Sequence, residues 1–502
     1  MDARRRWLVL GVLGLPLFGV VLNNSVLNVA VPALMRDLGA TTSTVQWIVD
    51  TYSLVFAGLL ITAGGVADRY GRKRVTLTGL AVFGAASIAA SLADGAPALI
   101  AARAAMGLGA AMVMPGTLAI LVDVFPPAER AKAIAAWGSI AALGVAAGPV
   151  LGGLLVGALG WSSVFLVNVP LALVTIGLGL VLLPESSDPE AGRPDLGGAL
   201  LSTLATSAFV YAVITVPGAG WTARGVWGAL GLSALAAAGF VAWERRQRHP
   251  LLDLRLLRDR RFSGAALSGM LLVFGLSGTL FVLTQHLQLA LGYSPLRAGL
   301  AVAPVAVAVG AASSVAPAVS RRFGQRAGVG AGLTVVASGI LVIGWAPGGY
   351  PPVLGGLLLM GCGFGLALTP ATDALMSSLP PERSGTGSAL SDTMQELGYA
   401  LGVAVTGSVL TAVYARDLTA RAGEVAEAAR SSLAAALDLG LGGPARQAFA
   451  VALPLGLTVG ACVVLLGAAC ALALLPGRLT GPAVVADDTR TPPIPAREGI
   501  RT

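Results

Sequence analysis

Long apolar runs separated by short polar breaks dominate the sequence from residue 7 onward. Most of these runs are close to the ~20 residues that a helix needs to cross the hydrocarbon core of a membrane. Their spacing predicts fourteen membrane-spanning helices, joined mainly by short loops. The predicted spans cover residues 7–35, 45–67, 75–93, 97–124, 131–157, 163–183, 196–216, 224–243, 262–291, 297–319, 327–346, 351–378, 384–411 and 450–475.

A charged turn at residues 64–74, Gly-Gly-Val-Ala-Asp-Arg-Tyr-Gly-Arg-Lys-Arg, separates the second and third runs. Its five charged side chains require water, so the turn lies at a membrane surface. Short loops rich in Lys and Arg stay on the cytoplasmic side of a membrane. The even number of spans then places both termini in the cytoplasm, and most of the 33 Lys and Arg residues fall on that side.

Composition supports a membrane protein. The chain is 55% hydrophobic and 12% charged, with a mean hydropathy of +0.80, which is more apolar surface than a soluble domain can bury. The net charge of +8 is spread over short loops, so the lipid bilayer and not nucleic acid is the expected partner. The three cysteines lie inside apolar runs and offer neither a disulfide framework nor a metal site.

The charged turn has a weaker copy at residues 321–326, Arg-Arg-Phe-Gly-Gln-Arg, 253 residues after the Asp68 stretch. This repeat indicates two related six-helix bundles with two inserted helices. We expect an N-terminal bundle at 1–190, inserted helices and a basic linker at 191–261, and a C-terminal bundle at 262–478.

Two further segments differ from the spans in pattern. Between the last two spans, at 412–449, Val425, Ala429, Leu433 and Leu437 recur every four positions. They predict an amphipathic helix on the protein or membrane surface, with a functional lid as the alternative. The proline-containing tail at 479–502 is expected to be disordered.

Ionisable residues inside the spans cost about 2.5–3.5 kcal/mol each on insertion scales, so each needs a reason. Asp373, near one end of its span, and His286, close to Gln285 and Gln288, are expected to be interfacial groups, with a transport role as the alternative. The remaining ionisable residues are Asp50, Arg103, Asp392 and Glu396.

Asp50 and Arg103 lie at similar depths in spans 2 and 4 and can face each other. One interpretation is a buried ion pair that fixes helix packing, because an unpaired buried charge is costly. The other is that Asp50 is exchanged between Arg103, a proton and a substrate.

Asp392 and Glu396 are four residues apart and share a face of span 13. Two carboxylates held so close in apolar surroundings cannot both ionise readily, so the pair is suited to carrying a proton. The alternative is a polar stripe that lines water or binds the backbone of a neighbouring helix.

Small residues along span 5 suggest a close helix–helix contact. Gly144, Gly148, Gly152 and Gly153 lie along span 5 and allow a neighbouring helix to approach closely, while Pro149 can kink the span.

In the turn, Gly71 permits the change of direction. Asp68 can face the N-terminus of span 11 in the other bundle, and Arg72 can meet Asp123 at the end of span 4. This cluster is a candidate latch between the bundles.

Taken together, the motifs resemble the major facilitator superfamily, and specifically its fourteen-span drug:proton antiporter branch. Gly64-x-Val66-Ala67-Asp68-Arg69-x-Gly71-Arg72-Lys73 is similar to the superfamily's loop motif between spans 2 and 3. Further stretches also resemble motifs of the family. They are Gly144-x-x-x-Gly148-Pro149-x-x-Gly152-Gly153 in span 5, Arg103-Ala104-Ala105-Met106-Gly107 in span 4, and residues 28–32 and 47–52 in the first two spans.

The resemblance implies a proton-coupled antiporter that exports amphipathic, cationic drugs, dyes or biocides by alternating access, without a cofactor. It favours the exchange role of Asp50, and it implies that the span-5 contact seals a leak path. Where relatives commonly carry a first-span aspartate, this chain has Asn23, followed by Asn24. Proton coupling is therefore assigned to Asp392, Glu396 and Asp50, and substrate contact to Asp50, Asn23, Asn24, Tyr52, Met114 and Asp392.

A second reading of the same fold is an exporter dedicated to one endogenous product, such as an antibiotic, a lipid or a siderophore. The 31 Arg against 2 Lys, with abundant Ala and Gly, resembles a high-GC bacterial proteome and indicates a bacterial cytoplasmic membrane. A nucleotide-driven pump or a membrane enzyme lacks sequence support, because no P-loop and no catalytic constellation occurs. We expect a monomer that binds a small-molecule substrate and protons.

Overall fold

The computed structural model describes the chain apart from residues 1, 188–194, 248–255, 346–348, 379–383 and 476–502, so the predicted tail at 479–502 lies outside the described residues. The described residues are almost entirely helical, with no β-strand among them. The helices up to residue 244 are α1 (Ala3–Asp37), α2 (Thr42–Tyr70), α3 (Arg72–Ser91), α4 (Ala96–Val124), α5 (Pro127–Leu159), α6 (Ser163–Leu166), α7 (Asn168–Leu182), α8 (Leu196–Ala219) and α9 (Arg224–Glu244).

The rest of the chain continues in the same way, with a short 3₁₀ helix, η1, and a π-helix, η2. Its elements are η1 (Leu256–Arg258), α10 (Arg260–Gln285), η2 (His286–Ala290), α11 (Pro295–Val302), α12 (Pro304–Phe323), α13 (Gln325–Trp345), α14 (Tyr350–Met376), α15 (Ser384–Ala422), α16 (Glu427–Ser431), α17 (Leu433–Asp438) and α18 (Gly442–Leu474).

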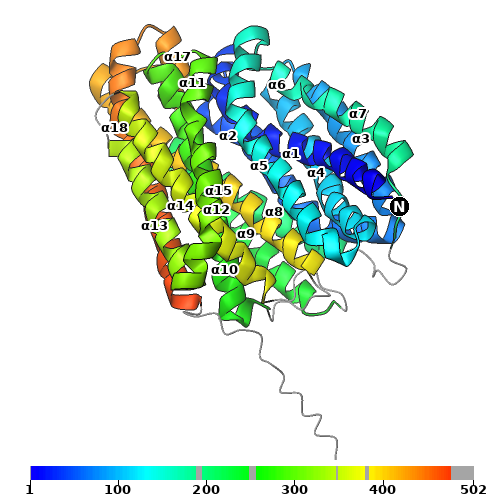
Figure 1. Ribbon diagram of the computed structural model, residues 1–502. Helices are drawn as coiled ribbons and strands as arrows, with labels where there is room; N and C mark the ends of the chain where they lie inside the picture. Colours follow the sequence, from blue (N-terminus) through cyan, green and yellow to red (C-terminus); the bar gives the residue numbers. More distant parts are fainter. Residues whose placement is uncertain (1, 188–194, 248–255, 346–348, 379–383, 476–502) are drawn as a thin grey trace, which may run out of the picture.

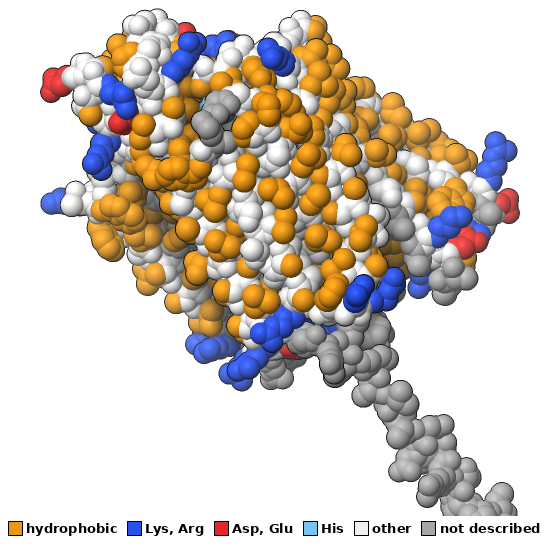
Figure 2. Space-filling view, turned by 60° about the vertical axis from the view of Figure 1, so that its left-hand side comes forward, with side chains coloured by type: hydrophobic (Ala, Val, Ile, Leu, Met, Phe, Trp, Pro, Cys, Tyr) orange, Lys and Arg blue, Asp and Glu red, His pale blue; other side chains and the backbone are white. Residues whose placement is uncertain are grey.

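Fourteen helical segments in the described part of the chain are long and apolar enough to cross a membrane. The prediction of an all-α protein with fourteen membrane-spanning helices is therefore confirmed. Apolar side chains cover the middle of the face shown in Figure 2, and Lys and Arg side chains gather towards its ends. Such a belt is suited to lipid, since soluble monomers rarely expose so large an apolar surface.

Two predicted spans are interrupted. Span 6 is divided into α6 and α7 at Val167, and span 10 into α11 and α12 at Ala303. The break in span 10 has a clear cause: Pro304 has no backbone N–H to donate, and its ring displaces the carbonyl one turn earlier.

The prediction of a single amphipathic helix within 412–449 is wrong. Helix α15 extends to Ala422, α18 begins at Gly442, and the intervening segment contains the two short helices α16 and α17. Ser432 separates them: its backbone is extended, at φ −150°, and its side chain accepts a hydrogen bond from the N–H of Ala435 at the start of α17. The four apolar positions still pack on the protein, with Ala429 and Leu433 buried.

The helices pack mainly within two groups, α1–α7 and α10–α18, which lie on opposite sides in Figure 1. The first is called the N-bundle and the second the C-bundle. Each contains a glycine turn with positive φ, at Gly71 (φ 110°) between α2 and α3 and at Gly324 (φ 86°) between α12 and α13. Their equivalent places match the sequence repeat, and the end of the molecule that holds both turns is called the motif end.

The bundle-to-bundle hydrogen bonds made by the described residues lie between mid-depth and the opposite end, called the far end. Gln46 donates to the carbonyls of Val403 (3.0 Å) and Ala404 (2.9 Å). Gln288 donates to the carbonyl of Val29 at 2.9 Å. Helices α5 and α11 also meet there, where Gly153 lies against Leu296. The bundles are thus joined at the far end.

Replacing Gly153 by alanine is expected to lower the melting temperature of the purified protein. The added Cβ would lie 2.7 Å from Cα of Leu296 and from the carbonyl oxygen of Pro295, and overpacking of this kind costs about 1–3 kcal/mol. The matched control is Gly157→Ala on the same helix, where an added Cβ meets no atom within 4 Å. That variant should be neutral or slightly stabilising. Equal melting temperatures would contradict the close contact of α5 with α11.

Candidate functional site between the bundles

Polar side chains meet near mid-depth, where α1, α2 and α4 of the N-bundle face α15 of the C-bundle. Asn24 Nδ2 donates to Glu396 Oε1 at 3.3 Å, and Asn28 Nδ2 donates to the hydroxyl of Tyr399 at 3.1 Å. The Tyr399 hydroxyl in turn donates to the carbonyl of Asn24 at 3.3 Å. These bonds join α1 to α15 across the bundle boundary, inside otherwise apolar helices.

Glu396 and Asp392 have different surroundings, although they share a face of α15. The second oxygen of Glu396, Oε2, is buried and has no hydrogen-bond partner among the described residues. Asp392, one turn nearer the motif end, is partly buried, as the Glu396 residue is as a whole. Glu396 is therefore joined to the other bundle through Asn24, whereas Asp392 makes no such bond in the described part of the chain.

Arg103, on α4, is fully buried. Its Nε donates to the carbonyl of Ile48 at 2.9 Å, and its Nη2 donates to the carbonyl of Val49 at 3.4 Å. Its guanidinium lies 4.4 Å from the centre of the Tyr52 ring, a cation–π contact. Arg103 therefore binds α2 through backbone carbonyls and an aromatic face, and its Nη1 has no partner among the described residues.

Asp50 is also fully buried, and neither of its carboxyl oxygens has a hydrogen-bond partner in the described part of the chain. The ion pair with Arg103 that the sequence suggested is absent here, because the guanidinium is engaged by Ile48, Val49 and Tyr52 instead. An ionised carboxylate in this place would be buried without a direct hydrogen bond or ion pair among the described residues, which is costly.

The polar contacts between α1, α2 and α4 of the N-bundle and α15 of the C-bundle are called the junction. The other residues predicted to contact substrate lie near it. Asn23 is buried with an unpartnered Nδ2, and the Tyr52 hydroxyl is buried without a partner among the described residues. Met114 is half-buried against the main apolar core. Asp373 is exposed near the motif end of α14, and His286 stacks on Phe449 with ring centres 6.2 Å apart. His286 Nδ1 has no hydrogen-bond partner among the described residues, and the Asp373 carbonyl accepts from Ser377 on the same helical segment.

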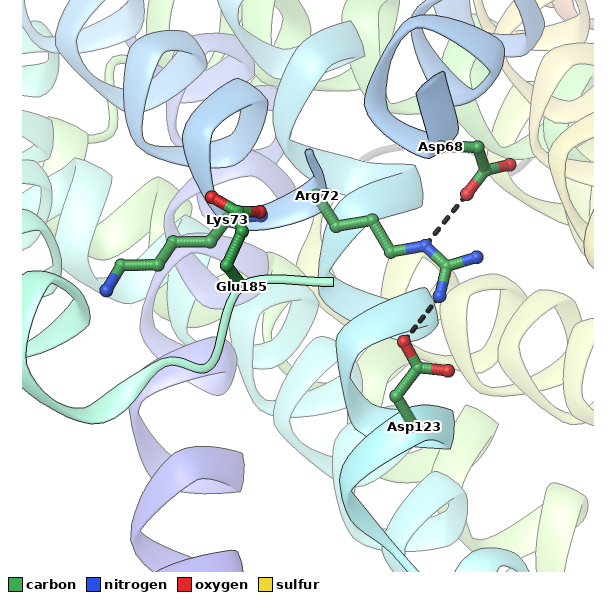
Figure 3. A network of polar contacts seen from close by, with 5 residues as sticks. All are labelled: Asp68, Arg72, Lys73, Asp123 and Glu185. Atoms are coloured by element: carbon green, nitrogen blue, oxygen red, sulfur yellow. Dashed lines mark hydrogen bonds and ion pairs between the residues drawn. The ribbon is translucent and has the colours of Figure 1, made fainter. Parts of the chain in front are cut away.

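A second polar cluster lies at the motif end of the N-bundle (Figure 3). Arg72 donates to Asp68 at 2.8 Å and also forms an ion pair with Asp123, as the sequence suggested. Glu185 accepts from the backbone N–H of Lys73 at 3.1 Å and lies 3.5 Å from the Arg74 guanidinium. The cluster ties together the ends of α2, α3 and α4 and the segment after α7.

The predicted latch from Asp68 to span 11 is not formed in this conformation. The assigned partner of the Asp68 carboxylate is Arg72 in its own bundle, and Arg69 instead lies over the Tyr70 ring at 5.7 Å. Gly64 packs on Pro115 of α4, where an added Cβ would be 3.4 Å from Pro115 Cβ.

The α5 glycines contact two neighbours. Gly144 lies against the carbonyl of Phe18, Gly148 against Ser25, and Gly152 against the carbonyl of Val26, all on α1. Gly153 and the carbonyl of Pro149 instead contact α11, at Leu296 and Gly299 respectively. The motif therefore packs α5 onto its own bundle and onto the other bundle at once.

Sequence reasoning missed three residues of these clusters. Tyr399 and Asn28 supply bonds across the bundles, and Glu185 binds the turn after α2. The sequence could have indicated Tyr399, because it follows Glu396 by three residues and so lies on the same helical face. Glu185 could have been found as an acid that follows a span at the predicted cytoplasmic surface.

Residues 13–403, most of the chain, match the sequence profile of the Major Facilitator Superfamily. The chain belongs to this superfamily. Among curated proteins it is 39% identical to the Multidrug resistance protein Stp of Mycobacterium tuberculosis (strain CDC 1551 / Oshkosh) over 411 residues, which are 82% of this chain and 76% of that protein. It is 37% identical to the Multidrug efflux pump LfrA of Mycolicibacterium smegmatis, over 84% of each chain. The predicted resemblance to superfamily drug exporters is confirmed.

Two solved structures of transporters share the fold. A bacterial homologue of the human lysosomal transporter Spinster, in an inward-facing and unoccupied conformation, has a TM-score of 0.66 at 16% identity and covers 94% of this chain and 98% of that one. The human organic anion transporter MFSD10 (TETRAN) has a TM-score of 0.59 at 19% identity, over 94% of this chain and 100% of that one. At these identities the likeness shows the fold alone.

Replacing Gly71 by alanine is expected to destabilise the turn by about 1–3 kcal/mol, because its φ of 110° is strained for any residue with a Cβ. The added Cβ would also lie 2.7 Å from Glu185 Oε1. Thermal unfolding should show this loss of stability. The control is Gly65→Ala, where an added Cβ meets nothing within 4 Å. In a Glu185→Ala background, Gly71→Ala should lose less stability, because only the steric clash is relieved; no loss at all in that background would exclude backbone strain at Gly71.

Proposed function

We propose that the protein is a proton-coupled antiporter that exports amphipathic, cationic drugs, dyes or biocides by alternating access. The motif end and both termini would face the cytoplasm of a bacterial cell, since the basic turn at residues 69–74 lies at that end. The far end would face the outside. The energy source would be the proton gradient, with no bound cofactor, and the transporting unit a monomer.

The names of the relatives support the direction and the substrate class. Stp and LfrA are named for multidrug resistance and multidrug efflux. A further relative, from Salmonella typhimurium (strain 14028s / SGSC 2262), is named a methyl viologen resistance protein and is 33% identical over 85% of this chain. Methyl viologen is a dication, so a relative with this name agrees with a path that accepts positive charge.

The observation that carries proton coupling is the bond from Asn24 to Glu396 across the bundles. An ionised Glu396 accepts this bond at Oε1, while its Oε2 is buried without a donor. A proton on Glu396 would neutralise the buried charge and weaken the charge-assisted bond to α1. Proton uptake and the separation of α1 from α15 would thus be coupled through one carboxyl group.

Asp50 and Arg103 would supply the second proton-dependent contact. In the present conformation Arg103 binds the Ile48 and Val49 carbonyls, and Asp50 has no partner among the described residues. If a movement of α4 against α2 within the N-bundle released Arg103 from those carbonyls, the guanidinium could pair with Asp50 and displace its proton. Asp50 would then be charged in one conformation and neutral in the other.

Asp392 is the acid best placed to balance a cationic substrate. It lies one helical turn from Glu396, shares its intermediate burial and helical face, and has no bond to Asn24 of the other bundle to hold it. A cation beside Asp392 would favour the ionised pair, whereas its release would favour proton uptake by the pair. Cation and proton would therefore compete for the same two carboxylates, which is the requirement for exchange.

Export of one endogenous antibiotic is the alternative function, and specific relatives favour it. The probable actinorhodin transporter of Streptomyces coelicolor is 36% identical over 86% of this chain. A growth-inhibition panel distinguishes the two: resistance to many unrelated cations supports the multidrug function, and resistance to one compound family supports the dedicated exporter.

The direct test is export of tetraphenylphosphonium from proteoliposomes under an imposed pH gradient. This cation carries a permanent charge, so its own protonation cannot move it. Addition of an uncoupler should stop uphill export, because the proton gradient is the proposed energy source. An unchanged rate after collapse of the gradient would contradict proton coupling.

Asp392→Asn is expected to reduce gradient-driven export of tetraphenylphosphonium by at least about tenfold, which is 1.4 kcal/mol, while the melting temperature stays near that of the wild type. Glu396→Gln should abolish coupling and also alter stability, because it changes the bond to Asn24. Asp373→Asn, an exposed acid outside the junction, is the matched control. Wild-type export by Asp392→Asn would remove this residue from the mechanism.

A further inference from the structure

The two inserted helices, α8 and α9, form one hairpin. Ser233 Oγ on α9 donates to the carbonyl of Ala205 on α8 at 2.8 Å. Nearer the motif end, Trp243 Nε1 on α9 donates to Asp195 Oδ1 at 2.8 Å. The Trp243 ring also covers Gly197 of α8, where an added Cβ would lie 2.5 Å from the ring. Helix α9 is therefore held mainly by α8, and the attachment of the hairpin to the bundles depends on α8.

Helix α8 contacts both bundles. Its side chains form one buried apolar cluster with α2 of the N-bundle and α15 of the C-bundle, made of Val210, Ile214, Leu54, Ala400 and Ala404. Alternating access requires the two bundles to move against each other. Helix α8 cannot keep both contacts unchanged during that movement, so one of the two must slip.

The contact of α8 with α2 includes directional bonds. Near the far end, the Ser43 hydroxyl of α2 donates to the carbonyl of Ile214 at 3.5 Å. Nearer the motif end, the Thr62 hydroxyl of α2 donates to the carbonyl of Asp195 at 3.3 Å. Hydrogen bonds weaken steeply when donor and acceptor are displaced from their preferred geometry. Two such bonds at opposite ends of the contact therefore oppose sliding of α8 along α2.

Between these bonds the side chains of α8 and α2 interdigitate. The Thr203 side chain of α8 fills the space beside Gly58 of α2, where an added Cβ would lie 2.8 Å from Thr203 Cβ. Towards the far end, the rings of Trp47 on α2 and Tyr211 on α8 pack with their centres 6.1 Å apart. A side chain inserted into the surface of a facing helix has to leave before the helices can slide. The α8–α2 contact is thus fixed by shape as well as by hydrogen bonds.

The contact of α8 with α15 is different in kind. On α15 it is made by Ala400 and Ala404, with Leu401 packed beside them. The interhelical hydrogen bonds assigned to α8 in the described part of the chain go to α2 and α9. Apolar contact is non-directional, and alanine side chains project little from the helix surface. Helix α15 can therefore shift along α8 at a lower cost than α2 can.

We propose that the α8–α9 hairpin moves with the N-bundle as one rigid body, and that the surface between α8 and α15 is the plane along which the C-bundle slides. This inference rests on the proposed function, because it takes alternating access as given. Eight of the fourteen membrane-spanning segments, the six of the N-bundle and the two inserted ones, would then move together against the other six.

Distances between spin labels test which bundle the hairpin follows. Labelled cysteines replace Val181 on α7, Leu200 on α8 and Phe323 on α12, whose side chains are 60–74% exposed. All three lie towards the motif end, and the three native cysteines are changed to serine. Each pair is measured by double electron–electron resonance at acidic and at alkaline pH, with and without tetraphenylphosphonium. The Val181–Phe323 pair reports the movement of the bundles themselves.

The Val181–Leu200 distance should stay constant while the Val181–Phe323 and Leu200–Phe323 distances change together. A constant Leu200–Phe323 distance with a changing Val181–Leu200 distance would show that the hairpin follows the C-bundle. That result, or a change in the Val181–Leu200 distance of any other kind, would overturn the inference while the proposed export stands. A Val181–Phe323 distance that is the same under every condition would contradict alternating access, and the proposed function and this inference would fail together.

Cross-links test the same proposal by activity. Gly58→Cys with Thr203→Cys joins α2 to α8, since the two Cβ atoms already lie within the ~3.8 Å typical of a disulfide. Export of tetraphenylphosphonium from proteoliposomes should then stay within about twofold of the reduced sample, because no moving surface is blocked. Val210→Cys with Ala404→Cys, joined by a short reducible thiol reagent, fixes α8 to α15 and should lower export at least about tenfold until it is reduced. Full export with α8 fixed to α15, or loss of export with α8 fixed to α2, would contradict the sliding surface.

Discussion

A carboxyl group inside an apolar helix bundle needs a hydrogen-bond donor or a proton, and the junction at Glu396 depends on this requirement. Asn24 supplies the donor from the opposite bundle, at 3.3 Å. The surrounding contacts are carbonyl and hydroxyl bonds that tolerate little separation, such as those of Gln46 with Val403 and Ala404. Because few polar bonds join the bundles in the described part of the chain, a change of one charge at Glu396 alters a large share of the polar contact between them.

Arg103 is a buried cation and likewise needs hydrogen-bond partners, which in its case must be acceptors. Its guanidinium is buried and forms no ion pair with a carboxylate in the part of the chain that the structure describes, and it is held by two α2 carbonyls and the face of Tyr52. Those carbonyls are dipoles and not charges, so they hold the cation less strongly than Asp50 could. The arrangement leaves an acid and a base in neighbouring helices without a bond between them, which is a state that a movement of α4 against α2 can end.

Much of the fold could be predicted from the sequence, because lipid imposes a simple rule on length and polarity. The charged turn at residues 64–74 and the glycines of α5 were also recognisable from the sequence. A tight turn and a close helix contact both require residues of particular types at fixed spacing. The rest depends on side-chain choices across helices. Arg103, for which a lasting ion pair with Asp50 was one of two interpretations, binds backbone carbonyls in this structure. Ser432 divides a predicted helix by capping the next one, and Glu185 joins a cluster from 112 residues away. The partners of Arg103 and Glu185 are 55 and 112 residues away in sequence, so no periodic pattern indicates them, whereas the Ser432 cap is local and interrupts a regular apolar pattern.

Helix α15 contains 39 residues, which at 1.5 Å per residue is a rod of about 58 Å, nearly twice the thickness of a bilayer core. Glu396 lies well inside this rod, and 26 residues separate it from Ala422 at the tip, about 39 Å further on. A rotation of about 10° around the junction would carry the tip through about 7 Å by simple leverage. A movement of that size would disturb α16, which packs beside α15 and whose Ala429 carbonyl accepts a hydrogen bond from the Tyr414 hydroxyl at 3.1 Å.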